Sequence, residues 1–544
     1  MDRRLRLVFG VACVAWALAG CDVGGPVTPP APVPGGVANL TSDDVTKAEI
    51  LRNVIRLIET AATSPGGKNF DIAAENLNQY FETTEPAAFA LPPETRAFLL
   101  EALKGTPIEL PSLEERPFRI RDARHIEDCL LYHTVATRVA GAGGTLERVR
   151  RLFDWVVRHV ELVPAERMTP PGLPQAAARP YDVLLRGMAT EQAGFWAERA
   201  WVFMALGRQL GVDIGLVRYQ GPGRTDPVVW VCAALVDGRA YLFDARVGCE
   251  VPGLGGRGVA TLEQAAADPA VLRQLDLGRQ SPYYTTAADL AAHPLVILID
   301  SSLGYLSPRM RLLQRDLAGR NRMILYRDPL EQRAAFAAAL GERFGGAELW
   351  KLPLEIEYRL FHDAQFVTAS LYPLQAFDPQ LPLLHARLTH LRGDLEAAVG
   401  AYVGFRMAEG ATLRDGRTPI PPDVQEALNA YATYFLALCQ LEQGNSRQAE
   451  FLFGQALKRQ PRPARGLPFS LFLWGAQFNL GRLAEDRGDL RVAIGYYCRP
   501  DPTMQRHGNL LRATALVWRD PTSAPAPPPP PTPPPLLQAS PPAL

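Results

Sequence analysis

The sequence has no excess of charge of either sign and very little lysine. Its 544 residues carry 57 basic and 57 acidic side chains, and only five of the basic ones are lysine. A general nucleic-acid binder needs an excess of basic side chains on one face, so this class is excluded. The seven cysteines form no Cys-x-x-Cys pair, which excludes a zinc ribbon and a thioredoxin-like redox motif. After residue 20, no apolar run approaches the ~20 residues that a membrane-spanning helix needs.

The first 20 residues have the parts of an export signal. Three arginines lie within residues 3–6, residues 7–19 form an apolar run, and the run ends in the letters LAGC. The run is too short for a stable membrane span but suits a secretory signal. LAGC resembles the lipobox of bacterial lipoproteins, in which the peptide is cut before an acylated cysteine. The resemblance predicts that residues 1–20 are removed and that Cys21 carries the lipid; the alternative is a plain secretory signal with a chance cysteine.

The predicted lipid determines where the protein is expected to act. Each CH₂ group of an acyl chain contributes about 0.8 kcal/mol when it is buried in a bilayer, so multiple acylation of Cys21 anchors the protein firmly. We therefore expect a bacterial cell-envelope protein that faces the periplasm or the exterior. Residues 21–40 are rich in Pro and Gly and almost free of charge, as is typical of a tether. Removing the signal leaves a mature net charge of about −2.

Residues 41–141 show helical spacing of apolar side chains and no catalytic motif. Polar residues at 41–44 are predicted to cap a first helix, and Pro93 to begin another. His125 and His133 are eight residues apart, so they can share one helix face. Two histidines without further ligands do not make a metal site, and we interpret both as ordinary core or solvated residues.

Residues 142–250 are expected to fold as two helices followed by three strands. Thr145 is predicted to cap the first helix, and the second helix covers about 196–210. Asp237-Gly238 marks a hairpin turn between the last two strands. The strands are predicted from runs of β-branched and aromatic residues at 214–219, 228–236 and 240–247.

The hairpin determines which cysteines can meet. About the Asp237-Gly238 turn, Cys232 lies opposite Phe243, so Cys249 is about six residues too far along the strand for a disulfide. We therefore interpret Cys232 and Cys249 as buried small hydrophobic residues.

Three segments of this region resemble, in order, the transglutaminase-like superfamily, which shares the papain-like core. They are LERVRRLFDWVVRHVEL, FWAERAWVFMALGRQLGVDIGLVRY and DPVVWVCAALVDGRAYLFD. They are similar to the family's leading helix, to its nucleophile helix with the ending A-L-x-R-x-L-G-[IV], and to its histidine strand followed by an Asp-Gly hairpin. The resemblance implies helices packed on an antiparallel sheet.

In that family, a cysteine at the helix N-terminus attacks an acyl carbonyl, a histidine accepts its proton, and an aspartate orients the histidine. The cysteine position corresponds here to Trp196. The histidine position corresponds to Val228 when counted from the strand tryptophan, and to Val229 when counted from the turn. Only the aspartate is retained, as Asp244. We interpret Asp244 as a structural hydrogen-bond acceptor and Trp196 as core packing. The alternative is that Trp196 caps a former cleft that still binds a peptide or a glycan.

The loss of catalytic groups does not depend on the alignment. No cysteine lies between Cys129 and Cys232, and no histidine between His159 and His293. We therefore predict a pseudoenzyme, because valine and tryptophan provide neither nucleophile nor base. The alternative is a peptidase or acyltransferase with a displaced nucleophile, Cys232, which strand alternation places on the same face as Trp230. That enzyme needs a histidine from elsewhere, either His159 or His293.

Residues 251–370 carry no catalytic motif. One helix is predicted over residues 259–275. Apolar runs at 294–299 and 323–326 are typical of buried strands, and a helix is predicted between them. This βαβ-like unit is expected to extend the sheet or to form a small α/β addition.

Residues 378–519 are predicted to be helical and contain an internal repeat. The pattern Gly-x₄-Ala-x₃-[Phe/Tyr] resembles tetratricopeptide repeats. In these repeats Gly lies in a turn, Ala allows two helices to approach closely, and the aromatic side chain fills the gap to the next hairpin. The units are about 51 and 44 residues apart rather than about 34, which predicts long connections. The resemblance implies a protein-binding surface; packing against the preceding domain is the alternative. The pattern begins at Gly393, Gly444 and Gly488.

Residues 520–544 contain the run PPPPPTPPP, which is typical of an extended, disordered tail. The predicted fold class is α+β, with a transglutaminase-like domain at 142–250, an α/β extension at 251–370 and an all-α tetratricopeptide-like region at 378–519. The expected function is binding or scaffolding, through the membrane lipid and a protein partner of the repeats, with no cofactor, metal or nucleic acid. A role in a secretion or surface-assembly system is a third hypothesis, for which no partner is indicated.

Overall fold

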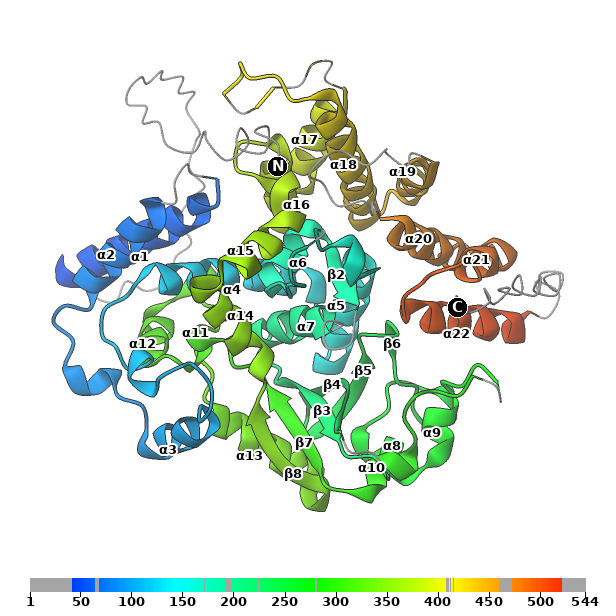
Figure 1. Ribbon diagram of the computed structural model, residues 1–544, viewed down its shortest axis with the longest axis horizontal. Coiled ribbons are helices and arrows are strands. Elements are labelled where there is room, and N and C mark those ends of the chain that lie inside the picture. Colours follow the sequence, from blue (N-terminus) through cyan, green and yellow to red (C-terminus); the bar gives the residue numbers. More distant parts are fainter. Residues whose placement is uncertain are drawn as a thin grey trace, which may run out of the picture. The chain divides into compact units, whose positions relative to one another are not determined.

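The computed structural model describes residues 42–63, 68–170, 172–191, 197–223, 226–278, 281–407, 410, 412–413, 415–458 and 472–520. The predicted signal and tether lie outside these residues, as do Cys21, Trp196 and residues 521–544 of the predicted tail. From Glu49 onward the described residues form one compact unit. Helices and a mixed sheet both contribute to it (Figure 1), which confirms the predicted α+β class.

Six strands of the described chain form one mixed sheet (Figure 1) in the order β6-β5-β4-β3-β7-β8. All neighbours are antiparallel except β7 and β8, which are parallel. A separate parallel pair joins β1 to β2. The strands span Glu161–Pro164 (β1), Met188–Glu191 (β2), Ile214–Tyr219 (β3), Val228–Val236 (β4), Arg239–Asp244 (β5), Cys249–Glu250 (β6), Leu295–Ile299 (β7) and Phe344–Leu349 (β8).

The β4–β5 hairpin forms where the sequence predicts it. Asp237 and Gly238 both have positive φ, 49° and 72°, as a tight two-residue hairpin turn requires. Cys232 pairs with Phe243, which confirms the predicted register. β5 ends at Asp244, before the predicted residue 247, because the Gly248 amide donates to the Asp244 carbonyl at 2.8 Å and turns the chain into β6.

The prediction of a strand at residues 323–326 is wrong, because side-chain amides take the place of a neighbouring strand. Gln314 Oε1 accepts from the backbone amides of Leu325 and Tyr326, and the Gln209 amide bonds both to the amide and to the carbonyl of Ile324. The parallel partner of β7 is β8 instead. Its sequence, FGGAEL, contains two glycines, which weaken a strand signal.

Three helices, α4, α5 and α6, pack around α7, which lies against β3. Their apolar faces meet in a core that includes Phe153, Phe203 and Phe243, with ring centroids 5.1–5.3 Å apart. The predicted cap at Thr145 is wrong by one residue, since Gly144 is the N-cap and Thr145 the first helical residue. The helices span Ser42–Ala61 (α1), Lys68–Tyr80 (α2), Pro93–Ala102 (α3), Ile120–Ala140 (α4), Thr145–His159 (α5), Pro180–Arg186 (α6) and Ala197–Gln209 (α7).

Among the helices of residues 262–371, α8 packs on β5, and α13 packs on β4, β5, β7 and β8. The single helix predicted over residues 259–275 is interrupted at Asp268-Pro269, because Asp268 leaves α-helical geometry and its side chain caps the next helix through the Ala270 amide. The helices are Leu262–Ala267 (α8), Pro269–Arg273 (α9), Ala287–Ala292 (α10), Leu303–Leu306 (α11), Pro308–Asp316 (α12), Pro329–Leu340 (α13), Lys351–His362 (α14) and Ala364–Leu371 (α15).

The predicted repeat corresponds to three helical hairpins. The repeat glycines Gly393, Gly444 and Gly488 lie in the hairpin turns with φ of 90°, 78° and 82°. The repeat alanines and aromatics are all fully buried, and they are Ala398, Tyr402, Ala449, Phe453, Ala493 and Tyr497. No helix in the described ranges is long and apolar enough to cross a bilayer. The C-terminal helices are Pro382–Leu391 (α16), Leu395–Met407 (α17), Pro422–Glu442 (α18), Ser446–Lys458 (α19), Leu473–Asp486 (α20), Leu490–Tyr497 (α21) and Gln505–Arg519 (α22).

Candidate functional site

A bulge in β4 separates the residues that the sequence placed on one face. Leu216 pairs with Cys232, but Arg218 pairs with Val229, so β4 contains one extra residue between these pairs. Cys232 packs in the core with α5 and α7, whereas Trp230 packs in the other core of the sheet and donates from Nε1 to the Tyr283 hydroxyl at 3.0 Å. The predicted shared face of Cys232 and Trp230 is therefore wrong.

The same bulge distinguishes the two candidate histidine positions. Val229 packs against the core that contains α7, and Val228 against the opposite core. Val229 is therefore the one of these two β4 positions that packs toward α7. Trp196, which precedes the first residue of α7, lies outside the described residues.

Asp244 is fully buried at the end of β5 and accepts four hydrogen bonds. Two come from the hydroxyls of Tyr283 and Tyr284, at 2.5 and 2.8 Å, and two from the backbone amides of Arg246 and Val247, at 2.9 and 3.0 Å. Burial raises the pKa of Asp244, and these donors oppose the rise. The carboxylate thus acts as a structural acceptor, since four donors already occupy its oxygens.

Cys232 has none of the surroundings of a reactive thiol. It is fully buried, and burial raises the pKa of its thiol. Among the two histidines considered for it, His293 is exposed and His159 hydrogen-bonds to Glu442. Five cysteines are free in the described chain, and only Cys498 among them is exposed.

The C-terminal helix α22 closes the space beside the first turn of α7. The Arg199 guanidinium donates to Gln505 Oε1 at 2.7 Å and to the carbonyl of Val160 at 2.7 Å. The Met504 amide donates to Glu191 Oε2 at 2.7 Å. The cavity that remains between Arg199 and Gln505 has a volume of about 10 Å³, which is room for one water molecule at most.

Gly508 allows α22 to approach this closely. A Cβ atom at Gly508 would lie 2.1 Å from the carbonyl oxygen of Val247, so Gly508→Ala is expected to displace α22 and lower the free energy of unfolding by about 1–3 kcal/mol. Gly495→Ala in α21 is the control, since nothing lies within 4 Å of its Cβ and alanine favours a helix. Urea unfolding measures both variants. Equal stability of the two would contradict the close contact.

A buried cluster joins α5 to the repeat helices. Glu442 Oε1 lies 2.8 Å from His159 Nε2, 3.1 Å from His390 Nε2 and 3.2 Å from Trp155 Nε1, and Oε2 pairs with Arg138. We call these five residues the Glu442 network. Because they come from α4, α5, α16 and α18, the network connects the sheet-bearing part of the chain to the hairpins.

The Glu442 network contains the ligand types of a zinc site, but its hydrogen bonds do not fit a metal. The candidate ligand atoms of His159, His390 and Glu442 lie within 4.8 Å of one another. However, Arg387 lies 3.1 Å from His390 Nδ1, and a guanidinium can only donate. His390 Nδ1 is therefore the acceptor, and Nε2 carries the proton that it donates to Glu442. A protonated Nε2 has no lone pair for a metal, so we interpret the cluster as structural.

Two connected cavities form a cleft on the other side of α7. The inner cavity, about 390 Å³, is lined by α4, α6, α7, α14 and α15. The outer groove, about 920 Å³, is lined by α2, the start of α4 and α14. Five residues line both, and they are Arg121, Arg124, Leu303, Glu357 and Phe361.

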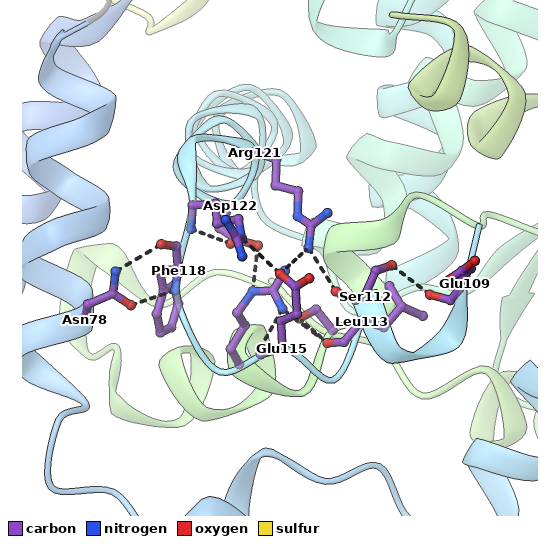
Figure 2. A network of polar contacts seen from close by, with 11 residues as sticks. Asn78, Glu109, Ser112, Leu113, Glu115, Phe118, Arg121 and Asp122 are labelled. Atoms are coloured by element: carbon purple, nitrogen blue, oxygen red, sulfur yellow. Dashed lines mark hydrogen bonds and ion pairs between the residues drawn. The ribbon is translucent and has the colours of Figure 1, made fainter. Parts of the chain in front are cut away.

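Polar contacts hold the segment that leads into α4 at the base of this cleft (Figure 2). The Asn78 side chain bonds to both the amide and the carbonyl of Phe118, at 2.7 and 3.0 Å. Arg121 donates to the carbonyl of Ser112 at 2.9 Å. These contacts fix where α4 begins and therefore which of its side chains reach the cleft.

A fully buried ion pair lies under the same segment. Arg309 Nε is 2.9 Å from Asp122 Oδ1, and its NH1 group donates to the carbonyls of Leu113 and Glu115 at 3.2 and 2.9 Å. Burial raises the pKa of Asp122, and the Arg309 guanidinium opposes this rise. The two charges therefore compensate each other and are not free to bind a ligand.

The cleft was missed at the sequence level, although one signal was present. Arg121, Arg124, His125 and Asp128 recur at positions i, i+3, i+4 and i+7, which is one face of α4. Such a polar stripe is normally solvated, and here it lines the cavity. His125 Nε2 donates to the carbonyl of Leu325 at 2.9 Å, and His133 does not line the cleft, so the two histidines do not act together.

Comparisons with protein-family models, with curated proteins and with solved structures find no match for this chain.

Proposed function

We propose that the protein is a lipid-anchored envelope protein whose transglutaminase-like domain is catalytically degenerate and acts, with the tetratricopeptide-like hairpins, as a binding or scaffolding module. One observation carries this proposal. Beside the first turn of α7, the strand position that packs toward this helix is Val229, and Arg199 of that turn donates to Gln505 of α22. A valine supplies neither a nucleophile nor a base for acyl transfer.

The order and packing of elements support the transglutaminase-like resemblance. α5, α7 and the antiparallel strands β3, β4 and β5 follow in the expected order. Arg199 of α7 donates to the carbonyl of Ala245 at 3.2 Å, so the end of β5, which carries Asp244, lies beside the start of α7. The glycine turns and buried alanines of the hairpins support the tetratricopeptide-like resemblance in the same way.

A thiol-reactive acyl probe tests the loss of catalysis. With the detergent-solubilised protein at neutral pH, we expect slow modification of Cys498 alone, because it is the exposed cysteine and burial raises the pKa of the Cys232 thiol. Mass spectrometry locates the modification, and Cys498→Ser should abolish it. Rapid, stoichiometric modification of Cys232 would overturn the proposal.

The anchor is tested separately. Cys21→Ala is expected to move the protein from the membrane fraction to the soluble fraction, because the acylation site is lost. Immunoblotting of both fractions from cells that express either form measures the change, and Cys13→Ala in the signal is the matched control that should remain with the membrane. Unchanged partitioning of Cys21→Ala would refute lipidation.

A further inference from the structure

The outer groove contains three aromatic side chains on one face of α14. Tyr358, Phe361 and His362 follow at positions i, i+3 and i+4 of this helix, and all three line the groove. Phe361 is 64% exposed, and the ring centroids of Tyr358 and His362 are 4.3 Å apart. We call these three residues the aromatic face. Because aromatic rings gain free energy when their surface is covered, the aromatic face favours a ligand that has a flat apolar side.

Two polar side chains beside the aromatic face have few partners. Glu357 lies one helical turn before Phe361, and its only hydrogen bond in the described chain is a long one, 3.4 Å, from the Leu303 amide. Arg124 of α4 makes neither a hydrogen bond nor an ion pair with the described residues, and its guanidinium lies over the Phe70 ring at 5.8 Å. Glu357 and Arg124 line both the inner cavity and the outer groove, so they lie where the two join. The junction therefore offers an acceptor and a donor to a ligand.

Charges of both signs line the cleft in similar number. Four arginines and five carboxylates line the inner cavity, and one of these carboxylates, Asp300, pairs with Arg208 from outside the lining at 2.7 Å. Three arginines and four carboxylates line the outer groove, where Asp71, Glu75 and Glu109 are exposed to solvent. The lining therefore selects neither a cation nor an anion, and its many charges disfavour an acyl chain. The inner arginines are Arg121, Arg124, Arg179 and Arg309.

A saccharide has the chemistry that these surroundings require. The C–H side of a sugar ring is flat and apolar, so it can cover an aromatic ring, whose face is electron-rich. The hydroxyls project outward around the sugar ring, and each of them can both donate and accept. A neutral molecule can therefore bond to a carboxylate and to a guanidinium at once. The outer groove, about 920 Å³, has the size of a small-molecule site.

We infer that the cleft binds a neutral oligosaccharide, of which one sugar ring packs on Phe361 while hydroxyls of that ring or the next bond to Glu357 and Arg124 where the two cavities join. Further rings lie along the outer groove beside Tyr358 and His362. This inference rests on the proposed binding function and names the ligand class of that module.

Three neutral trisaccharides, cellotriose, maltotriose and chitotriose, are the probes. Titration calorimetry uses the full chain at neutral pH in a detergent without a sugar head group, and at least one probe is expected to bind with a Kd below about 1 mM. Raising the salt concentration to about 0.5 M is expected to leave this affinity unchanged, because the ligand carries no charge. Triethylene glycol, which has oxygen acceptors but no ring, is expected not to bind. Failure of all three probes, or equal affinity of triethylene glycol, would overturn the inference.

Two pairs of variants locate the contact. Phe361→Ala is expected to weaken the bound trisaccharide about fivefold or more, whereas Phe451→Ala, 58% exposed on α19 and outside the cleft, leaves its affinity unchanged. Glu357→Ala is expected to weaken it about tenfold, whereas Glu355→Ala, an exposed neighbour on α14, has no effect. Far-UV circular dichroism checks that each variant is folded.

Unchanged affinity in folded Phe361→Ala or Glu357→Ala would place the ligand elsewhere and overturn the inference. The thiol and membrane tests are independent of these outcomes, so the proposed function can stand or fall separately.

Discussion

Replacing Glu442 by glutamine is expected to lower the free energy of unfolding by about 3–5 kcal/mol. The carboxylate is 10% exposed and balances the charge of Arg138, which a neutral amide cannot do. Its Oε1 also receives the Trp155 and His390 donors at 3.2 and 3.1 Å. Glutamine keeps the shape but loses the charge, so the partly buried Arg138, 24% exposed, remains without an opposite charge. Urea unfolding followed by far-UV circular dichroism measures the loss.

The control for this variant is Glu426→Gln on the same helix. Glu426 is exposed on α18, so its substitution is expected to change the free energy of unfolding by less than about 0.5 kcal/mol. Both variants remove one negative charge from α18, and only the burial of the residue differs. Equal stability of the two variants would show that the Glu442 network contributes nothing to the packing of the repeats on α5.

The second large effect is expected for Glu198→Ala, which should lower the free energy of unfolding by about 4 kcal/mol. Glu198 is fully buried in the first turn of α7 and accepts from Arg186 at 2.7 Å. It also accepts from the backbone amides of Thr190 and Ala178, at 2.8 and 2.7 Å. Alanine leaves the Arg186 charge and two amides buried without partners. Thermal and urea unfolding of the variant measure the loss.

A double-mutant cycle identifies the source of that loss. Glu198→Ala leaves the charge of Arg186 buried without a partner, and Arg186→Met removes that charge. The double variant is therefore expected to be no less stable than Glu198→Ala alone. If the loss of stability in the double variant equalled the sum of the two single losses, the two residues would not share one network. Because this network holds β2 and the segment before α6 against α7, we also expect both single variants to be more sensitive to proteolysis.

Local signals in the sequence were sufficient for the hairpin and the repeats. Asp237-Gly238 requires positive φ at both positions, so the turn and the register of Cys232 against Phe243 follow from the turn itself. Gly393 and its equivalents likewise follow from helix-end geometry. Each of these features depends on residues only a few positions apart, so the local sequence specifies it directly.

Long-range partners decided where the predictions were wrong. Residues 323–326 have the composition of a strand, but their backbone groups bond to the side chains of Gln209, 115 residues away, and of Gln314, 11 to 12 residues away on α12. The bulge in β4 moved Trp230 to the face opposite Cys232, because one extra residue reverses strand alternation. Neither residue type nor spacing within the segment carries this information.

The sequence by itself determined that residues 160–231 contain neither a thiol nor an imidazole, since this is a matter of which residues are present. Only the tertiary structure decided that α22 fills the space beside α7, through Gln505 and Gly508, and that Glu357 and Arg124 line one cavity. These residues are separated by hundreds of positions along the chain. Their proximity comes from packing of apolar faces across the whole fold, and no local pattern encodes it.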